Sequence, residues 1–272
     1  MTTVAAALAR ARALGVDRVD ATLLLCALLG CERAWLITHD DAALTPEQSA
    51  RLEEQLRRRA DGEPIAYLLG RKEFHGLDLA VTADTLVPRP DTETLVDWAL
   101  ELLAPQHGAP KVVDLGTGSG AIALAIKHRH PAAQVEAVDL SAEALAIARS
   151  NAERLGLALR FHQGDWWQPL AGRRYDLIVS NPPYIAGDDP HLPALRHEPR
   201  QALTPEGDGL AALREIIDGA PQHLEPGGWL LLEHGYDQAE PVAALLRAGG
   251  FVDVALRRDL AGQPRVSGGR RP

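Results

Sequence analysis

The chain has 272 residues, of which 46% are hydrophobic, and a formal net charge of −9. This length exceeds one average domain and predicts a small and a larger folded unit. The acidic balance argues against a surface built to coat nucleic acid, because contacts with phosphates need clustered Lys and Arg. Cys26 and Cys31 lie in an apolar helical stretch without metal-ligand spacing, so we expect core thiols, a reducing compartment and no metal site.

Membrane attachment is not expected either. No apolar run approaches the ~20 residues of a membrane span, and no charged start precedes a long apolar stretch. We therefore expect a cytoplasmic monomer that contacts neither membrane nor nucleic acid.

Residues 1–72 are predicted to form successive helices. Asp20 can cap a segment that ends at Gly30, and Thr45-Pro46-Glu47-Gln48 has the pattern of a capping box that opens a helix as far as Ala60. This stretch contains no glycine-rich turn after a strand and no catalytic set of residues. Its predicted role is recognition or support.

Between residues 73 and 88 the apolar positions alternate, which predicts a hairpin linker. The segment Pro88–Glu93 then opens a helix that runs to Leu103. A proline-rich helix start with acids near its N-terminus explains this segment structurally. Contacts of Arg89 and Glu93 with a ligand would explain it equally well.

From residue 111 onward, predicted strands and helices alternate, which indicates a mostly parallel sheet with helices on both faces. The predicted strands span 111–115, 134–139, 159–163, 175–180, 228–233 and 251–256. Ligands of such sheets bind at the carboxyl ends of the strands. Residues that follow these strands are therefore candidates for one shared site.

A glycine turn, Gly116–Gly120, joins the first of these strands to a helical segment. Its glycines allow a ligand to approach the backbone, and the helix N-terminus behind them favours an anionic group. Its G-x-G-x-G spacing differs from that of dinucleotide folds. Asp139 ends the next strand, where an acid can accept hydrogen bonds from ribose hydroxyls, and Asp165-Trp166 fits an adenine clamp. Each feature alone also allows a structural interpretation: a plain turn, a solvated or capping acid, and an indole that covers the sheet edge.

The tetrapeptide Asn181-Pro182-Pro183-Tyr184 directly follows the apolar run 175–180. Two prolines have fixed φ and no N–H, so this bend is stiff and offers carbonyl acceptors without competing donors. Asn181 adds a side-chain carbonyl, and Tyr184 adds a ring against which a planar group can stack. The sequence alone also allows an ordinary turn. As a site, the bend is suited to gripping an –NH2 group.

The order of these motifs resembles that of S-adenosylmethionine-dependent methyltransferases that modify planar nitrogen. An amide nitrogen is a poor nucleophile, and the Asn181 side-chain oxygen and the Pro182 carbonyl could each accept one of its N–H groups. Alignment then supplies most of the acceleration, and the acceptors stabilise positive charge that grows on the nitrogen. No general base is needed, so we interpret Glu233-His234, at another strand end, as structural.

Longer segments carry a narrower resemblance: Glu63–Gly70, Glu73-Phe74, Thr85–Glu93, Asp114–Ala123 and Ser180–Ile185. With these segments the chain resembles, over essentially its whole length, the PrmC/HemK family of protein-(glutamine-N5) methyltransferases of bacterial peptide chain release factors. Pro88–Glu93 is the specific part, because the related family that acts on a ribosomal-protein glutamine differs there. The family has a last strand around Arg265-Val266, whereas Ser267–Pro272 departs from its pattern.

The resemblance implies a class I methyltransferase fold, Rossmann-like with a mostly parallel seven-stranded sheet. It implies a helical substrate-recognition domain (1–72), a hairpin linker (73–88) and a catalytic domain (89–272). S-adenosylmethionine would be the cofactor. The substrate would be the glutamine of the Gly-Gly-Gln loop in class 1 release factors.

The resemblance also implies roles for individual residues. The expected catalytic residues are Asn181, Pro182 and Tyr184. The expected cofactor-binding residues are Gly116, Thr117, Gly118, Ser119, Gly120, Asp139, Asp165, Trp166 and Asn181. The expected substrate-binding residues are Asn181, Pro182, Pro183, Tyr184, Arg89 and Glu93.

Other functions fit parts of the pattern. The same acceptor bend suits a ribosomal-protein glutamine or an exocyclic amine of adenine in DNA or rRNA, although the acidic charge and the lack of a target-recognition domain weigh against nucleic acid. A catalytically silent scaffold that binds a translation factor is a third alternative. The intact glycine turn and Asn181 argue against it.

Overall fold

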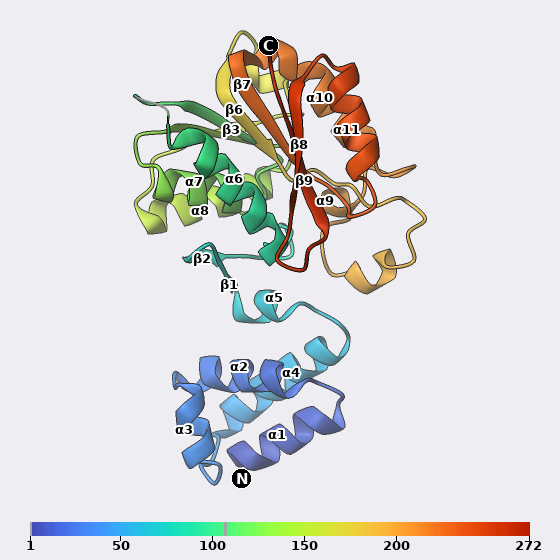
Figure 1. Cartoon of the computed structure of the whole chain (residues 1–272). Coiled ribbons are helices and arrows are strands. Elements are labelled where there is room, and N and C mark those ends of the chain that lie inside the picture. The colour runs from blue at the N-terminus through green and yellow to red at the C-terminus, as the bar shows by residue number, and fades with distance from the viewer. Residues whose placement is uncertain (1, 106–107) are drawn as a thin grey trace. The chain divides into compact units, whose positions relative to one another are not determined.

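The computed structural model describes residues 2–105 and 108–272. The chain divides into two compact units, Met1–Arg71 and Lys72–Pro272 (Figure 1). No helix in the described residues combines the length and the apolar character that a membrane crossing requires.

The N-terminal unit is helical. Its helices are α1 (Val4–Ala13), α2 (Arg18–Leu29), α3 (Arg33–Thr38), α4 (Pro46–Ala60) and α5 (Ile65–Leu69). Apolar side chains from all five pack into one core, which includes Val4, Leu24, Leu36, Leu56 and Leu68. Cys26 and Cys31 are half-buried at the edge of this core, so the expectation that they are core thiols is only partly met.

Helix starts follow from side-chain capping. The predicted capping box is confirmed, since the Thr45 hydroxyl accepts the Gln48 N–H at 3.1 Å and the Gln48 side chain accepts the Thr45 N–H at 2.9 Å. The predicted cap at Asp20 is wrong. Asp17 caps α2 by accepting the Val19 N–H at 2.7 Å, which places Asp20 in the first turn, where it pairs with Arg59 at 2.6 Å.

A two-stranded sheet precedes the larger sheet and falls in the region expected to be a hairpin. It consists of β1 (Arg71–Phe74) and β2 (Leu77–Ala80). The turn between them contains His75 and Gly76, both at positive φ, and the Gly76 N–H binds the Glu73 side chain at 2.7 Å. The buried residues Phe74, Leu77 and Leu79 join the core of the second unit.

The second unit contains one seven-stranded sheet with the order β5-β4-β3-β6-β7-β9-β8. Its strands are β3 (Lys111–Leu115), β4 (Gln134–Asp139), β5 (Arg160–Gln163), β6 (Tyr175–Ser180), β7 (Leu224–Glu233), β8 (Val252–Arg258) and β9 (Pro264–Arg270). All neighbouring pairs are parallel except those that β9 makes with β7 and β8. The predicted mostly parallel sheet is confirmed, with β7 beginning four residues earlier than expected, at Leu224 rather than residue 228.

Helices cover both faces of this sheet, which explains its continuous apolar strands (Figure 1). The helices of this unit are η1 (Pro90–Thr92), α6 (Glu93–Leu103), α7 (Ala121–Arg129), α8 (Ala142–Leu155), η2 (Gln168–Leu170), η3 (Leu192–Leu195), α9 (Arg200–Leu203), α10 (Ala211–His223) and α11 (Ala239–Ala248). Successive strand residues enter opposite cores: Val112 packs with α6 and α7, whereas Val113 packs with α10 and α11.

The C-terminal strand β9 is inserted between β7 and β8 and runs through the residues that depart from the family pattern. Gly268 lies so close to its neighbours that an added Cβ would stand 2.5 Å from Leu231 Cδ2 and 2.8 Å from Trp98 Cη2. Close packing against β7 and α6 therefore requires a glycine at this position. The closing edge of the sheet is β8.

Candidate active site

The two main motifs meet where the chain changes direction across the sheet. From β3 the strands progress through β4 to β5, and the chain then returns to β6, on the other side of β3. Leu115 and Ser180 are register partners at the ends of β3 and β6, and the Ser180 hydroxyl donates to the Leu115 carbonyl at 2.6 Å. The glycine turn and the Asn-Pro-Pro-Tyr bend therefore start side by side, at the place where open α/β sheets bind ligands.

A pocket with an open volume of about 1040 Å³ lies at this edge. It collects side chains from the glycine turn, the ends of β4, β5 and β6, and the segment before α6. Of the predicted site residues, its lining includes Arg89, Gly116, Thr117, Gly118, Ser119, Asp139, Asp165, Trp166, Asn181 and Pro183. Gly120, Glu93, Pro182 and Tyr184 lie outside this lining.

The glycine turn has the backbone that its sequence predicts. Gly116, Gly118 and Gly120 have φ values of 71°, 55° and 85°, which residues with a Cβ rarely adopt. The N–H groups of Gly116 and Thr117 both bind the Val138 carbonyl at 2.9 Å. At Gly120 an added Cβ would stand 2.9 Å from Leu124 Cδ1, so this glycine serves close packing.

Asp114, at the end of β3, braces the turn from below and was not identified from the sequence. Its Oδ2 accepts the Thr117 hydroxyl at 2.6 Å and the Ala123 N–H at 3.3 Å, whereas its buried Oδ1 has no hydrogen-bond partner in the described part of the chain. Burial raises the pKa of this carboxyl to about 7. The sequence signal that could have identified Asp114 was an acid in a buried strand, two residues before a glycine turn.

Asp139 faces the pocket from the end of β4. Its Oδ2 accepts the Gly118 N–H at 2.8 Å, and its Oδ1 accepts the Ser141 N–H at 2.9 Å. Burial raises its pKa, and these backbone donors oppose the rise. Each carboxylate oxygen can accept a further bond, so the carboxylate is both fixed in place and able to receive ligand hydroxyls.

The two adjacent tryptophans separate into different roles. Trp166 lines the pocket with a positive φ of 34°, and a Cβ added to Gly116 would stand 3.3 Å from its ring. Trp167 stacks on His223 with 4.7 Å between ring centroids and donates to the Glu215 carbonyl at 3.2 Å. Only Trp166 is therefore placed to stack on a planar ligand.

These features fit the nucleoside part of S-adenosylmethionine. The glycine backbone leaves room beside the Trp166 ring that a side chain would occupy. Asp139 presents carboxylate oxygens at the strand end where such folds bind ribose hydroxyls, and Asp165 lines the pocket together with Trp166. Helix α7 begins at Ala121, after an N-cap glycine that has no side chain. Asp114 already accepts the Ala123 N–H in its first turn, which leaves the earlier N–H groups at the helix N-terminus for a ligand carboxylate.

Asn181, the first residue of the acceptor bend, is held from one side. Its Nδ2 donates to Thr92 Oγ1 at 3.3 Å, and within the described part of the chain its Oδ1 receives no hydrogen bond. The bend is also anchored at its far end, where the Tyr184 carbonyl accepts from Gln238 Nε2 at 2.9 Å. Asn181 Oδ1 is therefore available as a hydrogen-bond acceptor at the pocket wall.

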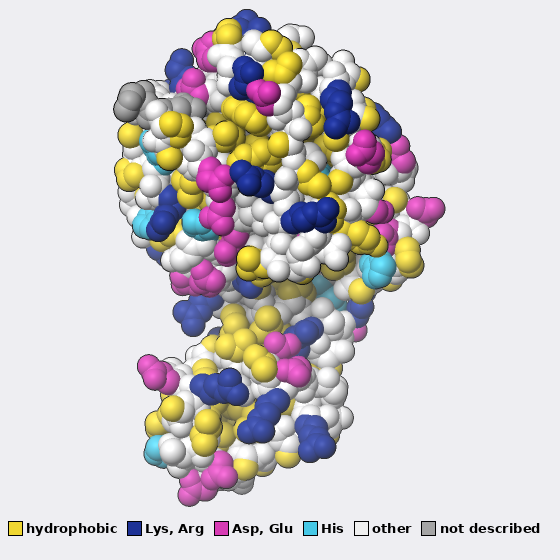
Figure 2. All heavy atoms as spheres, viewed as in Figure 1, with side chains coloured by type: hydrophobic (Ala, Val, Ile, Leu, Met, Phe, Trp, Pro, Cys, Tyr) yellow, Lys and Arg dark blue, Asp and Glu magenta, His cyan; other side chains and the backbone are white. Residues whose placement is uncertain are grey.

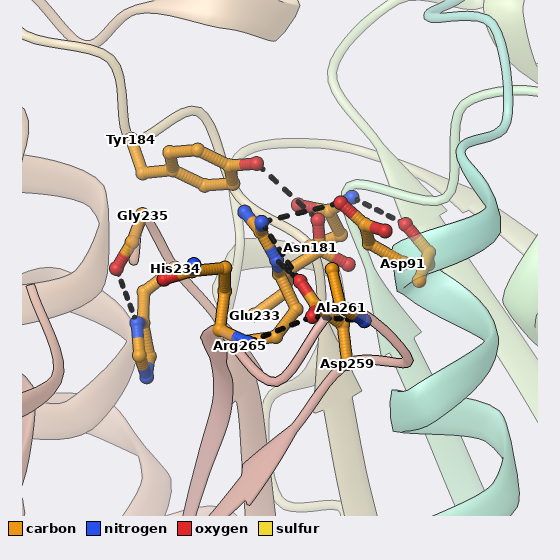
Figure 3. A network of polar contacts seen from close by, with 11 residues as sticks. Asp91, Asn181, Tyr184, Glu233, His234, Gly235, Asp259, Ala261 and Arg265 are labelled. Atoms are coloured by element: carbon orange, nitrogen blue, oxygen red, sulfur yellow. Dashed lines mark hydrogen bonds and ion pairs between the residues drawn. The ribbon is translucent and has the colours of Figure 1, made fainter. Parts of the chain in front are cut away.

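Tyr184 points to a different neighbour from the one expected. Its hydroxyl donates to Glu233 Oε1 at 3.3 Å, and burial raises its pKa (Figure 3). Pro182 is buried. The stacking role of Tyr184 and the gripping role of the Pro182 carbonyl stay predictions.

The two charged residues of the Pro88–Glu93 segment have protein partners. Arg89 lines the pocket and pairs with Glu198, whose Oε2 also accepts the Val87 N–H at 3.1 Å. Glu93 accepts the His75 N–H at 3.0 Å. The structure thus ties Arg89 to the loop before α9 and Glu93 to the β1–β2 turn, and their substrate contacts stay predictions.

His234 has a structural environment. Its Nε2 lies 2.8 Å from Ser267 Oγ and its Nδ1 lies 2.8 Å from the Gly235 carbonyl oxygen. The side chain is fully buried, and burial lowers its pKa, which favours the neutral ring. Both ring nitrogens are therefore committed within the protein, as a structural interpretation requires.

Comparisons with known proteins agree with this architecture. Residues 93–241 match the methyltransferase small domain, and residues 2–70 match the PrmC N-terminal domain. The chain is 54% identical over 258 residues to the release factor glutamine methyltransferase of Bordetella pertussis, covering 94% of this chain and 95% of that protein. It is 52% identical over 261 residues to the protein of the same name from Xylella fastidiosa, covering 94% of each.

A solved structure supports the fold. The T. thermophilus 16S rRNA N2 G1207 methyltransferase (RsmC), in complex with AdoMet and guanosine, has a TM-score of 0.53 and 19% identity, covering 74% of this chain and 50% of that one. The predicted methyltransferase fold with a helical N-terminal domain is confirmed. This chain belongs to the family of release factor glutamine methyltransferases.

Proposed function

We propose that this protein transfers the methyl group of S-adenosylmethionine to the side-chain amide nitrogen, N5, of a glutamine in class 1 peptide chain release factors. The glutamine is that of the Gly-Gly-Gln motif. The observation that carries the proposal is the Asn181 carboxamide, tethered through Nδ2 with Oδ1 left over, beside a glycine cradle that fits the cofactor. The family relationship supports the same substrate.

The acceptor bend aligns the amide. Asn181 Oδ1 accepts one N–H of the glutamine, and the Pro182 carbonyl accepts the other, so the face of the nitrogen that carries the lone pair is directed at the cofactor. S-adenosylmethionine supplies an electrophilic methyl group when it is bound. The glycine turn, Asp139 and Trp166 would hold the cofactor in the pocket beside the bend. Orientation of both reactants accounts for most of the rate increase.

The same acceptors act on charge. Positive charge grows on the amide nitrogen as its new bond to carbon forms, and two oxygens held against its protons stabilise that charge. The amide loses its extra proton readily after transfer, so water can accept it. This chemistry needs no general base, which agrees with a buried His234 whose nitrogens are both engaged.

The N-terminal helical unit, predicted over residues 1–72, is proposed to dock the protein substrate. Hydrophobic side chains reach its surface between charged ones (Figure 2). Val19 and Leu23, four residues apart on one face of α2, are 55% and 42% exposed, and Ile37 in α3 is 70% exposed. Exposed apolar groups of this kind suit a protein partner. We also propose a cytoplasmic location, because the proposed substrate is a translation factor.

The decisive experiment compares methyl acceptors. The purified protein is incubated with S-adenosylmethionine labelled in its methyl group and with a release factor, ribosomal proteins, DNA or rRNA. We expect one methyl group per release factor and none in a factor whose motif glutamine is replaced by alanine. Labelling of rRNA or DNA without labelling of the factor would overturn the proposal and favour an exocyclic amine as the acceptor.

A further inference from the structure

Both ends of the acceptor bend lead to one buried carboxylate. Asn181, its first residue, contacts Thr92 Oγ1 through Nδ2 at 3.3 Å, and Tyr184, its last, donates to Glu233 Oε1 at 3.3 Å. Thr92 in turn interacts with the Glu233 carboxylate and favours its charged form. Figure 3 shows Asn181, Tyr184 and Glu233 close together, beside Asp91 of the turn before α6.

We propose that Thr92 and Glu233 are positioning residues for methyl transfer, which hold the Asn181 carboxamide so that its oxygen faces the substrate amide. The proposal deepens the proposed function and rests on it. Neither residue touches the substrate. Each acts through Asn181.

Hydrogen-bond direction explains why both residues are needed. A threonine hydroxyl has one proton and two lone pairs. In accepting the Asn181 N–H at 3.3 Å, Thr92 Oγ1 keeps its own proton for another acceptor. The Thr92 hydroxyl favours the charged form of Glu233, which makes that carboxylate the acceptor toward which the proton turns. The carboxylate thereby favours the hydroxyl orientation that accepts from Nδ2, and the Nδ2 contact turns Oδ1 of the same amide away from Thr92.

An unpaired threonine hydroxyl would fix the amide poorly. It could instead donate to the carbonyl oxygen of Asn181, which would turn the –NH2 group toward the pocket. Two –NH2 groups facing one another cannot form the required bond, because both are donors. The direction of one hydrogen bond at Thr92 therefore decides whether Asn181 can accept from a glutamine.

Glu233 is a buried carboxyl group with one unpaired oxygen. Its side chain is almost fully buried, and its Oε2 has no hydrogen-bond partner among the described residues. A buried charge or unpaired acceptor of this kind is destabilising. Burial raises the pKa of Glu233 to about 7, while Thr92, Arg265 and Tyr184 oppose the rise.

Charged groups on neighbouring elements influence the protonation of this carboxylate. Arg265, on β9, lies 3.2 Å from Asp91 and 3.1 Å from Asp259, and its charge favours ionised Glu233. Asp91 precedes Thr92 in η1 and has the opposite effect. The pair of Arg265 with Asp91 thus links the turn that carries Thr92 to the strand beside Glu233.

The test is a double-mutant cycle on the full-length enzyme with a release factor as substrate. Thr92→Val keeps the shape of the side chain and removes the hydroxyl, and Thr92→Ser restores it. We expect Thr92→Val to lower kcat about tenfold, since small misalignments of a reactant are costly. The Kd for S-adenosylmethionine should stay within about threefold, and Thr92→Ser should recover most of the turnover. Adding Thr92→Val to Asn181→Ala should cause no further loss, because Thr92 acts through Asn181.

A matched control separates positioning from general loss of stability. Ser267→Ala removes another buried hydroxyl, on β9, that contacts His234 and neither Asn181 nor Glu233. We expect it to lower Tm without lowering kcat. If Thr92→Val does not fold, Glu233→Gln is the second variant, with a fall in kcat and an unchanged Kd for the cofactor as the expected result.

These experiments distinguish a positioning role for Thr92 from a purely structural one. Three results would each overturn the positioning role. The fold losses in kcat from Thr92→Val and Asn181→Ala could multiply in the double variant. Thr92→Val could retain the wild-type kcat, or it could lose only affinity for the cofactor. The wild-type enzyme provides the separate check of the proposed function. If it methylates no release factor, that function fails, whereas differences among the variants test only Thr92 and Glu233.

Discussion

Replacing Asp114 with asparagine should change how the stability of the catalytic unit depends on pH. Asp114 is fully buried, and burial raises its pKa from 3.8 to about 7, although hydrogen bonds from Thr117 and Ala123 oppose the rise. An asparagine has the same shape and can accept both hydrogen bonds through its carbonyl oxygen. The substitution therefore removes the titration while it preserves the brace under the glycine turn.

The sign of the effect follows from proton binding. With a folded-state pKa above the unfolded value, the folded protein retains the Asp114 proton at pH values where the unfolded chain has released it. The stabilisation is complete below pH 3.8 and is lost as the pH rises toward about 7. The two pKa values differ by an amount worth about 4 kcal/mol as an upper bound. About 3 kcal/mol of this falls between about pH 5 and about pH 8.

Urea unfolding followed by tryptophan fluorescence measures this quantity. Four of the five tryptophans lie in the Lys72–Pro272 unit, so the signal reports mainly on the catalytic unit. Asp139 and Glu233 also have raised pKa values and contribute to the overall pH dependence, so the informative quantity is wild type minus Asp114→Asn. We expect the free energy of unfolding of the wild type minus that of the variant to fall as the pH rises. If the free energies of unfolding of the two proteins depended on pH in the same way over this range, the raised pKa of Asp114 would be refuted.

Three further predictions concern the site and the docking surface. Asn181→Ala should abolish most turnover while the Kd for S-adenosylmethionine, measured by calorimetry, stays within about tenfold, because the amide aligns more than it binds; unchanged turnover would contradict its gripping role. Asp139→Ala should weaken cofactor binding by about 1–3 kcal/mol through lost hydrogen bonds to a carboxylate, and an unaltered Kd would rule out this contact. Leu23→Ser should raise KM for an intact release factor but not for a short Gly-Gly-Gln peptide; an equal effect on both substrates would exclude docking at α2.

Local patterns in the sequence predicted much of this structure. The Thr45 capping box depends on residues three positions apart, and the glycine turn and the proline bend each follow directly from a buried strand. The placement of both motifs at strand ends was enough to bring them to one pocket. Where two acids compete for one cap, as Asp17 and Asp20 do at the start of α2, spacing alone did not decide between them.

The remaining features depend on contacts between distant parts of the chain. Thr92 and Asn181 are 89 positions apart, and Tyr184 and Glu233 are 49 apart. No local pattern marks such partners. The insertion of β9 between β7 and β8 likewise depends on pairing after the chain has reversed. The glycines in this strand gave no strand signal because they serve close packing, Gly268 against Leu231 and Trp98 and Gly269 against Phe251.

The adjacency of β3 and β6 has a consequence for how such an enzyme could change its target. Their ladder pairs Leu115 with Ser180, so the cradle and the bend begin one interstrand spacing apart, roughly 4.8 Å. Main-chain bonding between the strands sets that separation, and the Ser180 hydroxyl reinforces it through its bond to the Leu115 carbonyl. Substitutions around the pocket entrance could therefore alter which substrate enters, while the methyl donor and the acceptor nitrogen remain at the same separation. A shift of one residue in the register between β3 and β6 would instead impair methyl transfer to every substrate.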